Sequence, residues 1–305
     1  MVLPSPFERL LQTIAQQANQ DPLGAFQRLD ELYGKSLTEH DVLQLAALSV
    51  HLGTTGLGRY DETIAFQHRL QKHPALNADS EVARSIWRGL AVTLLCANRR
   101  EAAQEAAAKG VTGPNDACRL AIMTAQTLLV RGRGAEAMPH LAQATKLVGE
   151  LPATDEVVGN MAMIANNLMR LVEPQVRMSQ DLVVAVAQAN RAAWARHPEW
   201  RARHRALYQH GQSLLLAARP TATLAVVQAM MEIEDQHEAG PLERFFTAAL
   251  ACRAQGVRGQ FKIAAGALEA CQDFAKRVDE AQRQQVAAAL TELEQVLALL
   301  REIQR

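Results

Sequence analysis

The sequence contains few aromatic residues, and this scarcity limits the kind of core that it can build. Aromatic residues make up 4% of the 305 residues, whereas hydrophobic residues together make up 49%. The core must therefore consist mainly of alanine, leucine, valine and methionine side chains. Because β-sheet cores depend on β-branched and aromatic residues, this composition favours closely packed helices.

The chain also lacks an excess of either charge. Lys+Arg and Asp+Glu both number 32, so the formal net charge is +0 at pH 7. Any attraction to nucleic acid or to an anionic membrane must then come from a local cluster. The first residues, MVLPSPFERL, do not form a signal peptide pattern, and no run of about 18 apolar residues occurs. We expect a soluble cytoplasmic protein with no membrane span, and we take a bacterial source as a working assumption.

Motifs of enzymes and metalloproteins are missing as well. The sequence has no P-loop, no nucleophile elbow, no HExxH and no glycine-rich fingerprint after a strand. The cysteines lack metal-ligand and redox spacing and lie among apolar residues of helical patterns, which predicts buried, reduced thiols. They are Cys96, Cys118, Cys252 and Cys271. We therefore expect no catalytic residue, no cofactor and no metal site. An enzyme would require a pocket that gathers side chains from distant helices.

The sequence does contain a succession of amphipathic segments separated by glycine or proline. In Arg131–Val148, Gly132 breaks the chain, and Ala137, Leu141 and Ala144 then follow at spacings of four and three, on one face of a helix. A single helical hairpin cannot cover its own apolar face, so it needs neighbours. Similar breaks recur at intervals of roughly 34 to 46 residues, within the range of helical repeats. They fall at Gly58, Asn98, Gly132, Pro174, Pro220 and Gly256–Gly259.

Two stretches resemble the second half of a tetratricopeptide repeat. Gly58–Pro74, GRYDETIAFQHRLQKHP, has a glycine at the turn, an aromatic residue two positions later, an acidic pair, alternating small and large positions and a closing proline. Gly132–Ala144 is similar, with small residues at Ala137 and Ala144 and a large one at Leu141. The resemblance implies a right-handed stack of helix pairs that acts as a protein-interaction scaffold, with the first helices lining a concave groove.

We therefore predict an all-α protein, a tetratricopeptide-like right-handed α-solenoid of about six antiparallel helix pairs with a C-terminal capping helix. It would form a single domain over residues 1–305, with an N-terminal helix pair in residues 1–37 and helical repeats in residues 38–278. The final helix, in residues 279–305, carries a heptad stripe that either caps the last hairpin or pairs with a second copy in a homodimer. The stripe consists of Val286, Leu290, Leu293, Leu297 and Leu300.

Long polar side chains recur on the first helices of successive predicted pairs. Side by side, they would line a groove with guanidinium and amide donors, which bind carboxylates and peptide backbone. We predict a non-catalytic scaffold or adaptor, with a possible regulatory role, that binds an acidic or C-terminal peptide segment of a protein partner there. The alternative is that these residues form ordinary solvated helix faces. The candidate residues are Arg84, Arg88, Arg119, Asn160, Asn167, Arg201, Arg205 and Tyr208.

The densest basic stretch, Arg191–His210, suggests a second hypothesis. Its sequence, RAAWARHPEWRARHRALYQH, interleaves basic and aromatic residues, a pattern typical of phosphate contact combined with base stacking. Trp194 and Trp200, however, occupy positions expected to face the core, and no matching basic surface occurs elsewhere in the chain. A helical-repeat protein that contacts nucleic acid is thus the alternative function. His197 and His204 are separated by Pro198, so they need not share a helix face, and we expect no metal there.

Overall fold

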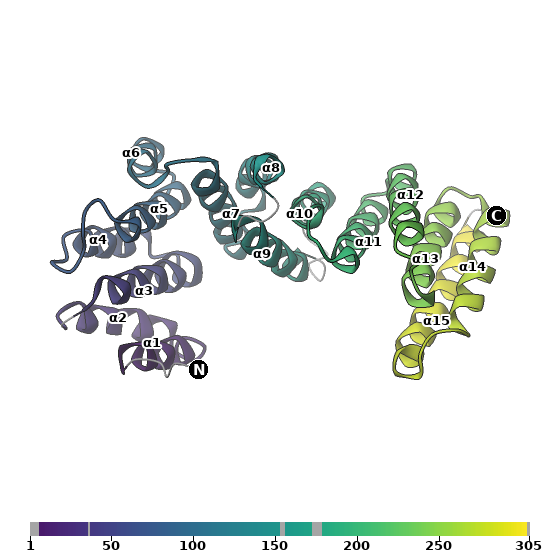
Figure 1. Ribbon diagram of the computed structural model, residues 1–305, viewed down its shortest axis with the longest axis horizontal. Coiled ribbons are helices and arrows are strands. Elements are labelled where there is room, and N and C mark those ends of the chain that lie inside the picture. The colour runs from purple at the N-terminus through teal and green to yellow at the C-terminus, as the bar shows by residue number, and fades with distance from the viewer. Residues whose placement is uncertain (1–5, 36, 153–155, 173–178, 304–305) are drawn as a thin grey trace. The chain divides into compact units, whose positions relative to one another are not determined.

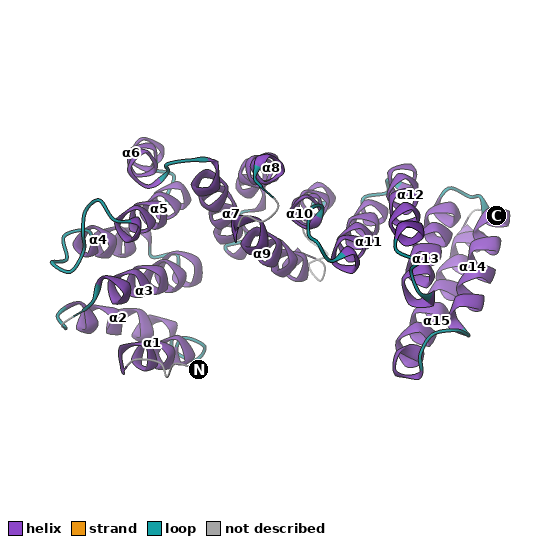
Figure 2. Ribbon diagram, in the orientation of Figure 1, coloured by secondary structure: helices purple, strands orange, loops and turns teal. Residues whose placement is uncertain are grey.

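The structure, a computed structural model, describes residues 6–35, 37–152, 156–172 and 179–303, without the side chains of residues 170–172. Within these ranges the chain forms fifteen α-helices and one π-helical segment, and no strand is present (Figure 2). The prediction of an all-α fold is therefore confirmed. Consecutive helices pack as pairs, most extensively α5 with α6, α7 with α8 and α13 with α14.

The chain divides into two compact units, which we describe separately: an N-terminal unit, Met1–Leu151, and a C-terminal unit, Pro152–Arg305 (Figure 1). The N-terminal unit contains α1 (Pro6–Gln17), α2 (Pro22–Tyr33), α3 (Glu39–Ser49), the π-helical segment η1 (Val50–Leu57), α4 (Tyr60–Leu70), α5 (Glu81–Cys96), α6 (Arg100–Gly110), α7 (Pro114–Val130) and α8 (Gly134–Glu150). The C-terminal unit contains α9 (Glu156–Val172), α10 (Gln180–Trp194), α11 (Trp200–Leu216), α12 (Pro220–Gln236), α13 (Pro241–Val257), α14 (Phe261–Ala275) and α15 (Glu280–Ile303). The organisation into one continuous domain stays a prediction.

Most helix boundaries lie where local sequence signals place them. Helix α3 begins with a capping box, because Thr38 Oγ1 accepts from the Asp41 backbone N–H and Asp41 Oδ2 accepts from the Thr38 backbone N–H. The breaks at Gly58, Asn98 and Gly132 have φ values of 68°, 60° and 71°, in the left-handed region where a helix ends. The predicted break at Pro174 lies outside the described residues.

The glycines from Gly53 to Gly58 do not form one long turn, because the chain stays helical as η1 and turns only at Gly58. Gly53 serves close packing instead. A Cβ atom at Gly53 would lie 2.1 Å from Thr63 Oγ1 and 2.6 Å from Phe26 Cε2, so only glycine lets η1 approach α2 and α4 this closely. A glycine that permits such an approach looks the same in the sequence as a glycine that makes a turn.

Two hydrogen-bonded threonine pairs connect η1 to α5 and α7. The hydroxyl of Thr54 lies 2.8 Å from that of Thr93 on α5, and the hydroxyl of Thr55 lies 3.1 Å from that of Thr127 on α7. Both pairs satisfy polar groups that burial would otherwise leave without partners. The end of α3 is thereby held against α5 and α7, which positions the cavity described below.

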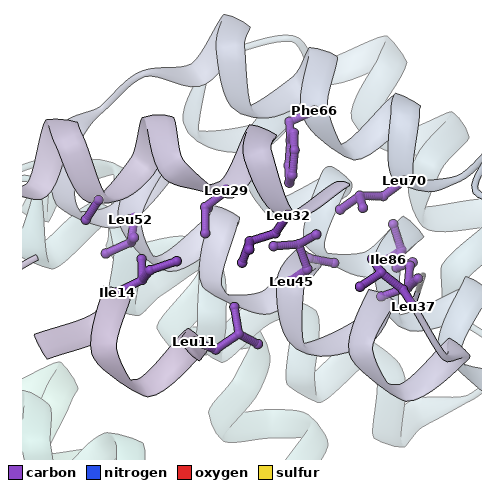
Figure 3. Packing of buried hydrophobic residues seen from close by; sticks show 13 residues of the cluster. Leu11, Ile14, Leu29, Leu32, Leu37, Leu45, Leu52, Phe66, Leu70 and Ile86 are labelled. Atoms are coloured by element: carbon purple, nitrogen blue, oxygen red, sulfur yellow. The ribbon is translucent and has the colours of Figure 1, made fainter. Parts of the chain in front are cut away.

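The first helices of the N-terminal unit contact one another in succession, α1 with α3, α3 with α5 and α5 with α7. Figure 3 shows how aliphatic side chains from α1 to α5 converge on one core, including Ile14, Leu45 and Ile86. Each fully buried side chain of this size contributes about 1.5–3 kcal/mol to folding. This core sets the spacing of the first helices and therefore of the side chains on their outer surface.

In the C-terminal unit, α15 packs against both α13 and α14. Val286, Leu293 and Leu297 of its heptad stripe are buried in the same cluster as Phe245 of α13. The capping interpretation of the final helix therefore accounts for these three residues. Ile303 on the same helix is 70% exposed. Pairing of this helix with a second copy remains a prediction.

The four cysteines are all buried and form no disulfide, as the sequence predicts. Burial raises the pKa of the Cys96 and Cys271 thiols to about 12 and that of Cys252 to about 11, so these three stay protonated at neutral pH. Among the described residues, none of the helices is at once long enough and apolar enough to cross a membrane.

Candidate functional site

Arg84 and Arg88 lie one turn apart on α5, but their environments differ. The Arg88 side chain is 6% exposed, and its Nη2 lies 2.6 Å from Glu81 Oε1. Its Nη1 lies 2.9 Å from Asp116 Oδ1 and donates to the Gly110 carbonyl at 2.9 Å. Arg88 therefore joins α5 to the end of α6 and the start of α7. Arg84 is more exposed and also contacts Glu81, with 3.0 Å from its Nε to Oε2.

Glu81 shows the electrostatic effect of this pair of arginines. Its partial burial acts to raise the pKa of its carboxyl, but hydrogen bonds from Arg88 and Arg84 prevail and hold the pKa below its ordinary value. Both guanidinium groups thus have a carboxylate partner within the protein. The donors predicted for a peptide at these two positions are already engaged.

A cavity of about 140 Å³ lies between α3, α5 and α7, on the first helices of the N-terminal unit. It brings together two of the predicted site residues, Arg88 and Arg119, whereas Arg84 does not line it. Met123 lies in its wall and is 39% exposed. The other lining residues are Leu43, Ala46, Ala47, Val50, Gln67, Ser85, Ile86 and Gly89.

Gln67 of α4 is the functional candidate that the sequence analysis missed. Its side chain is fully buried, and Nε2 donates to the Ala46 carbonyl at 2.9 Å and to Ser49 Oγ at 2.6 Å. Its Oε1 is buried without a hydrogen-bond donor. Leaving such an acceptor unsatisfied costs about 1–3 kcal/mol. Thr63, Gln67 and Leu70 follow one another at spacings of four and three, which places Gln67 on the buried face of α4. The sequence analysis took its candidates from the first helix of each pair, and α4 is a second helix.

The two predicted asparagines of the C-terminal unit lie on α9. Asn160 is half-buried, and its Nδ2 donates to Glu156 Oε1 at 3.2 Å, within the same helix. Asn167 is exposed. Within this unit α9 packs mainly against α10, whereas α11 packs against α10, α12 and α13, so the structure does not assemble the five into one site.

Arg201 and Arg205 lie one turn apart on α11, and each has a carboxylate neighbour. Arg201 Nε is 2.8 Å from Glu243 Oε1 on α13, and its guanidinium lies over the Trp200 ring at 4.7 Å from the centroid. Arg205 Nη2 is 3.8 Å from Glu199 Oε1, and its side chain is 73% exposed. Exposed pairs of this kind contribute little to stability, so Arg205 remains available to a partner.

Tyr208 follows on the same helix and is oriented by neighbours. Its hydroxyl accepts from Gln212 Nε2 at 3.1 Å, and its ring packs edge-on against Phe246 with centroids 5.2 Å apart. Burial raises the pKa of its phenol above the ordinary value. The tyrosine is therefore fixed between α11 and α13 and presents only part of its ring.

The two tryptophans of the basic stretch Arg191–His210 also have aromatic partners within the protein. The Trp200 ring stacks on His237, the residue that follows α12, with centroids 5.3 Å apart and planes at 4°. Trp194 contacts His197 edge-on at 4.8 Å. Both tryptophans are half-buried. Among the described residues no three of histidine, cysteine, aspartate and glutamate are grouped closely enough to hold a metal ion.

His210 of this stretch supplies a pH-dependent prediction. Burial, together with the charge of Arg191, lowers the pKa of His210 to about 4 from the ordinary value of 6.5. The unfolded chain binds a proton near pH 6.5 that the folded chain does not bind until about pH 4, so stability falls as the pH decreases through this interval. Between pH 7.5 and pH 5 this single group should cost about 2 kcal/mol of unfolding free energy.

Urea denaturation of the wild type and of His210→Asn at both pH values measures this contribution. Asparagine offers an oxygen to Arg191 in place of the ring nitrogen and cannot be protonated. The stability loss on acidification should be smaller in the variant by about 2 kcal/mol. An identical loss in the two proteins would show that His210 titrates normally in the folded chain.

No model of a protein family matches this sequence, and comparison with curated proteins also finds no match. The fold therefore identifies the structural class of the protein: it is an all-α protein whose consecutive helices pack in pairs.

Proposed function

We propose that this protein is a non-catalytic scaffold that binds an acidic or C-terminal peptide segment on the first helices of its N-terminal unit. The observation that carries the proposal is the cavity between α3, α5 and α7, which combines apolar walls with cationic and amide groups. Ligand pockets typically combine apolar walls with a few polar groups that fix the orientation of the ligand.

The size and lining of the cavity indicate what part of a peptide would enter it. Its volume of about 140 Å³ corresponds to about four or five water molecules at roughly 30 Å³ each, which suits one aliphatic side chain. Met123 and Val50 would contact that side chain. Arg119 would attract a neighbouring carboxylate, and Gln67 Oε1 would accept a hydrogen bond that nothing in the described chain donates.

The proposal therefore assigns different roles to the predicted residues. Arg119 lines the cavity and would contact the peptide in addition to its contacts within the protein, whereas Arg88 stabilises the helices that form the cavity, and Arg84 does not line it. The predicted residues of the C-terminal unit, Asn160, Asn167, Arg201, Arg205 and Tyr208, lie outside this cavity and have no part in the proposed site. We retain as part of the proposal a tetratricopeptide-like, right-handed stacking of the helix pairs, a cytoplasmic location and a homodimer through α15.

A cavity-filling variant tests this function directly. Ala47 lines the cavity and is exposed, so Ala47→Trp should fill the cavity without disturbing the core. Ala102→Trp, at an exposed position on α6, is the matched control. Peptides with free C-termini would be selected from a display library on the wild-type protein. Ala47→Trp should weaken the selected peptides at least about tenfold, which corresponds to loss of one buried aliphatic contact.

The Ala102→Trp control shows whether a loss of binding in Ala47→Trp comes from filling the cavity. Ala102→Trp should bind the selected peptides as the wild type does, and both variants should keep the wild-type helicity. If Ala47→Trp binds as tightly as Ala102→Trp, the cavity is not the binding site and the proposal fails.

A further inference from the structure

A pocket in the C-terminal unit contains two arginines for which the described residues supply no carboxylate partner. The pocket has a volume of about 250 Å³ and lies between α10, α11 and α12. Arg191 of α10 and Arg203 of α11 both line it, and both are half-buried. The other lining residues are Ala195, Leu207, Ala229, Glu232, Ile233 and Gln236.

The hydrogen-bond partners of these two arginines are imidazole rings. Arg191 Nη1 lies 3.3 Å from His210 Nδ1, and Arg203 Nη2 lies 3.1 Å from His237 Nε2. The Nε of Arg203 is buried and has no acceptor among the described residues. His210 is neutral at pH 7, because burial and the charge of Arg191 lower its pKa to about 4. Its ring therefore accepts a hydrogen bond from Arg191 without cancelling the positive charge.

Four other arginines of the same unit have a close carboxylate partner within the fold. Their nitrogens lie between 2.6 and 3.3 Å from a carboxylate oxygen. These pairs are Arg201–Glu243, Arg219–Asp181, Arg244–Asp235 and Arg253–Glu292. Half-buried guanidinium groups without such a partner are costly to maintain, and this cost falls when a bound anion supplies the missing oxygen atoms.

The one carboxylate in the pocket lining does not neutralise the arginines. Glu232 is exposed, and its Oε1 accepts from Gln228 Nε2 at 3.3 Å, one turn earlier on α12. It makes no ion pair within 4.0 Å of Arg191 or Arg203. The pocket walls contributed by Ala195, Leu207 and Ile233 are apolar. The pocket thus offers two cationic donors beside an apolar wall.

We propose that this pocket binds a small ligand that carries an oxyanion, either a carboxylate or a phosphate ester, attached to a compact apolar group. Arg191 and Arg203 would hold the oxyanion, and Leu207 and Ile233 would contact the apolar group. A volume of about 250 Å³ corresponds to about eight water molecules at roughly 30 Å³ each, which suits a metabolite of amino-acid size. This site is independent of the peptide surface proposed for the N-terminal unit.

The test is an NMR titration that observes the arginine Nε–Hε groups of the full chain. Inorganic phosphate and N-acetyl-leucine are added separately, with sodium chloride at matched ionic strength as the reference. The Arg191 and Arg203 resonances should shift saturably with at least one probe and not with chloride. Saturation with phosphate alone would assign a phosphate ester, and saturation with N-acetyl-leucine alone would assign a carboxylate.

Variants then locate the binding. Arg191→Gln and Arg203→Gln should each weaken binding by about ten- to a hundredfold, as expected when a hydrogen bond to a charged group is lost. Arg205→Gln on the same helix removes an exposed arginine outside the pocket and should leave the affinity unchanged. The proposal is overturned if neither probe shifts these resonances beyond chloride, or if Arg205→Gln weakens binding as much as Arg203→Gln. The wild-type titration decides alone if the pocket variants fail to fold.

Discussion

Replacing Arg88 with methionine should destabilise the N-terminal unit by about 3–5 kcal/mol, the range measured when one partner of a buried ion pair is removed. The Asp116 side chain is 14% exposed and would lose its ion pair with Arg88. The Gly110 carbonyl would lose the hydrogen bond that Arg88 Nη1 donates to it. Urea denaturation followed by circular dichroism measures the loss.

Arg84→Met is the control for this prediction. Arg84 lies on the same helix and contacts the same glutamate, but its side chain is 34% exposed. Its removal should cost no more than about 1 kcal/mol, as is usual for exposed ion pairs. If Arg88→Met is as stable as Arg84→Met, Arg88 does not hold α5, α6 and α7 together. If Arg88→Met is stable but does not bind peptide, Arg88 contacts the peptide directly.

The second large effect concerns a buried polar cluster in the C-terminal unit. His204 and Glu234 are each 3% exposed, and His204 Nε2 lies 2.8 Å from Glu234 Oε1. Thr247 Oγ1 lies 3.1 Å from the same nitrogen and also donates to Glu234. His204→Leu would leave the Glu234 carboxylate buried with only the threonine as a partner. We expect a loss of about 3–5 kcal/mol in unfolding free energy.

A double variant separates the buried carboxylate from the cavity that a substitution creates. His204→Leu/Glu234→Met removes both members of the pair and should recover most of the stability, because an apolar pair of similar volume can replace a buried hydrogen-bonded pair. Thermal and urea denaturation of the single and double variants measure the coupling free energy between His204 and Glu234. Losses that simply add in the double variant would show that His204 and Glu234 do not depend on each other.

Features governed by local sequence were predictable. The all-α fold follows from composition and helical spacing, and the capping box at Thr38–Asp41 follows from the two residue types and their separation. The breaks at Gly58, Asn98 and Gly132 were also identified correctly, since residues with short or absent side chains adopt the left-handed conformation most readily. Each of these features depends on residues only a few positions apart.

Features that depend on distant residues were not predictable. Arg88 looked like a surface donor because its partners Asp116 and Gly110 lie on other helices. Gln67 was overlooked because its burial depends on how α4 packs against α3, at Ala46 and Ser49. The basic stretch Arg191–His210 looked like one surface, yet contacts with α12 and α13 divide it among separate environments. A pattern of residue types does not contain the tertiary contacts that decide which charges stay available.

The most direct test of the proposed peptide surface is a methionine-methyl NMR titration of the wild-type chain with a selected peptide. Met123 lines the cavity on α7, and Met138 lies half-buried on α8 of the same unit, outside the cavity lining. The Met123 methyl resonance should shift saturably with the peptide, and the Met138 resonance should stay in place. A saturable shift of Met138 with Met123 unchanged would contradict binding on the first helices.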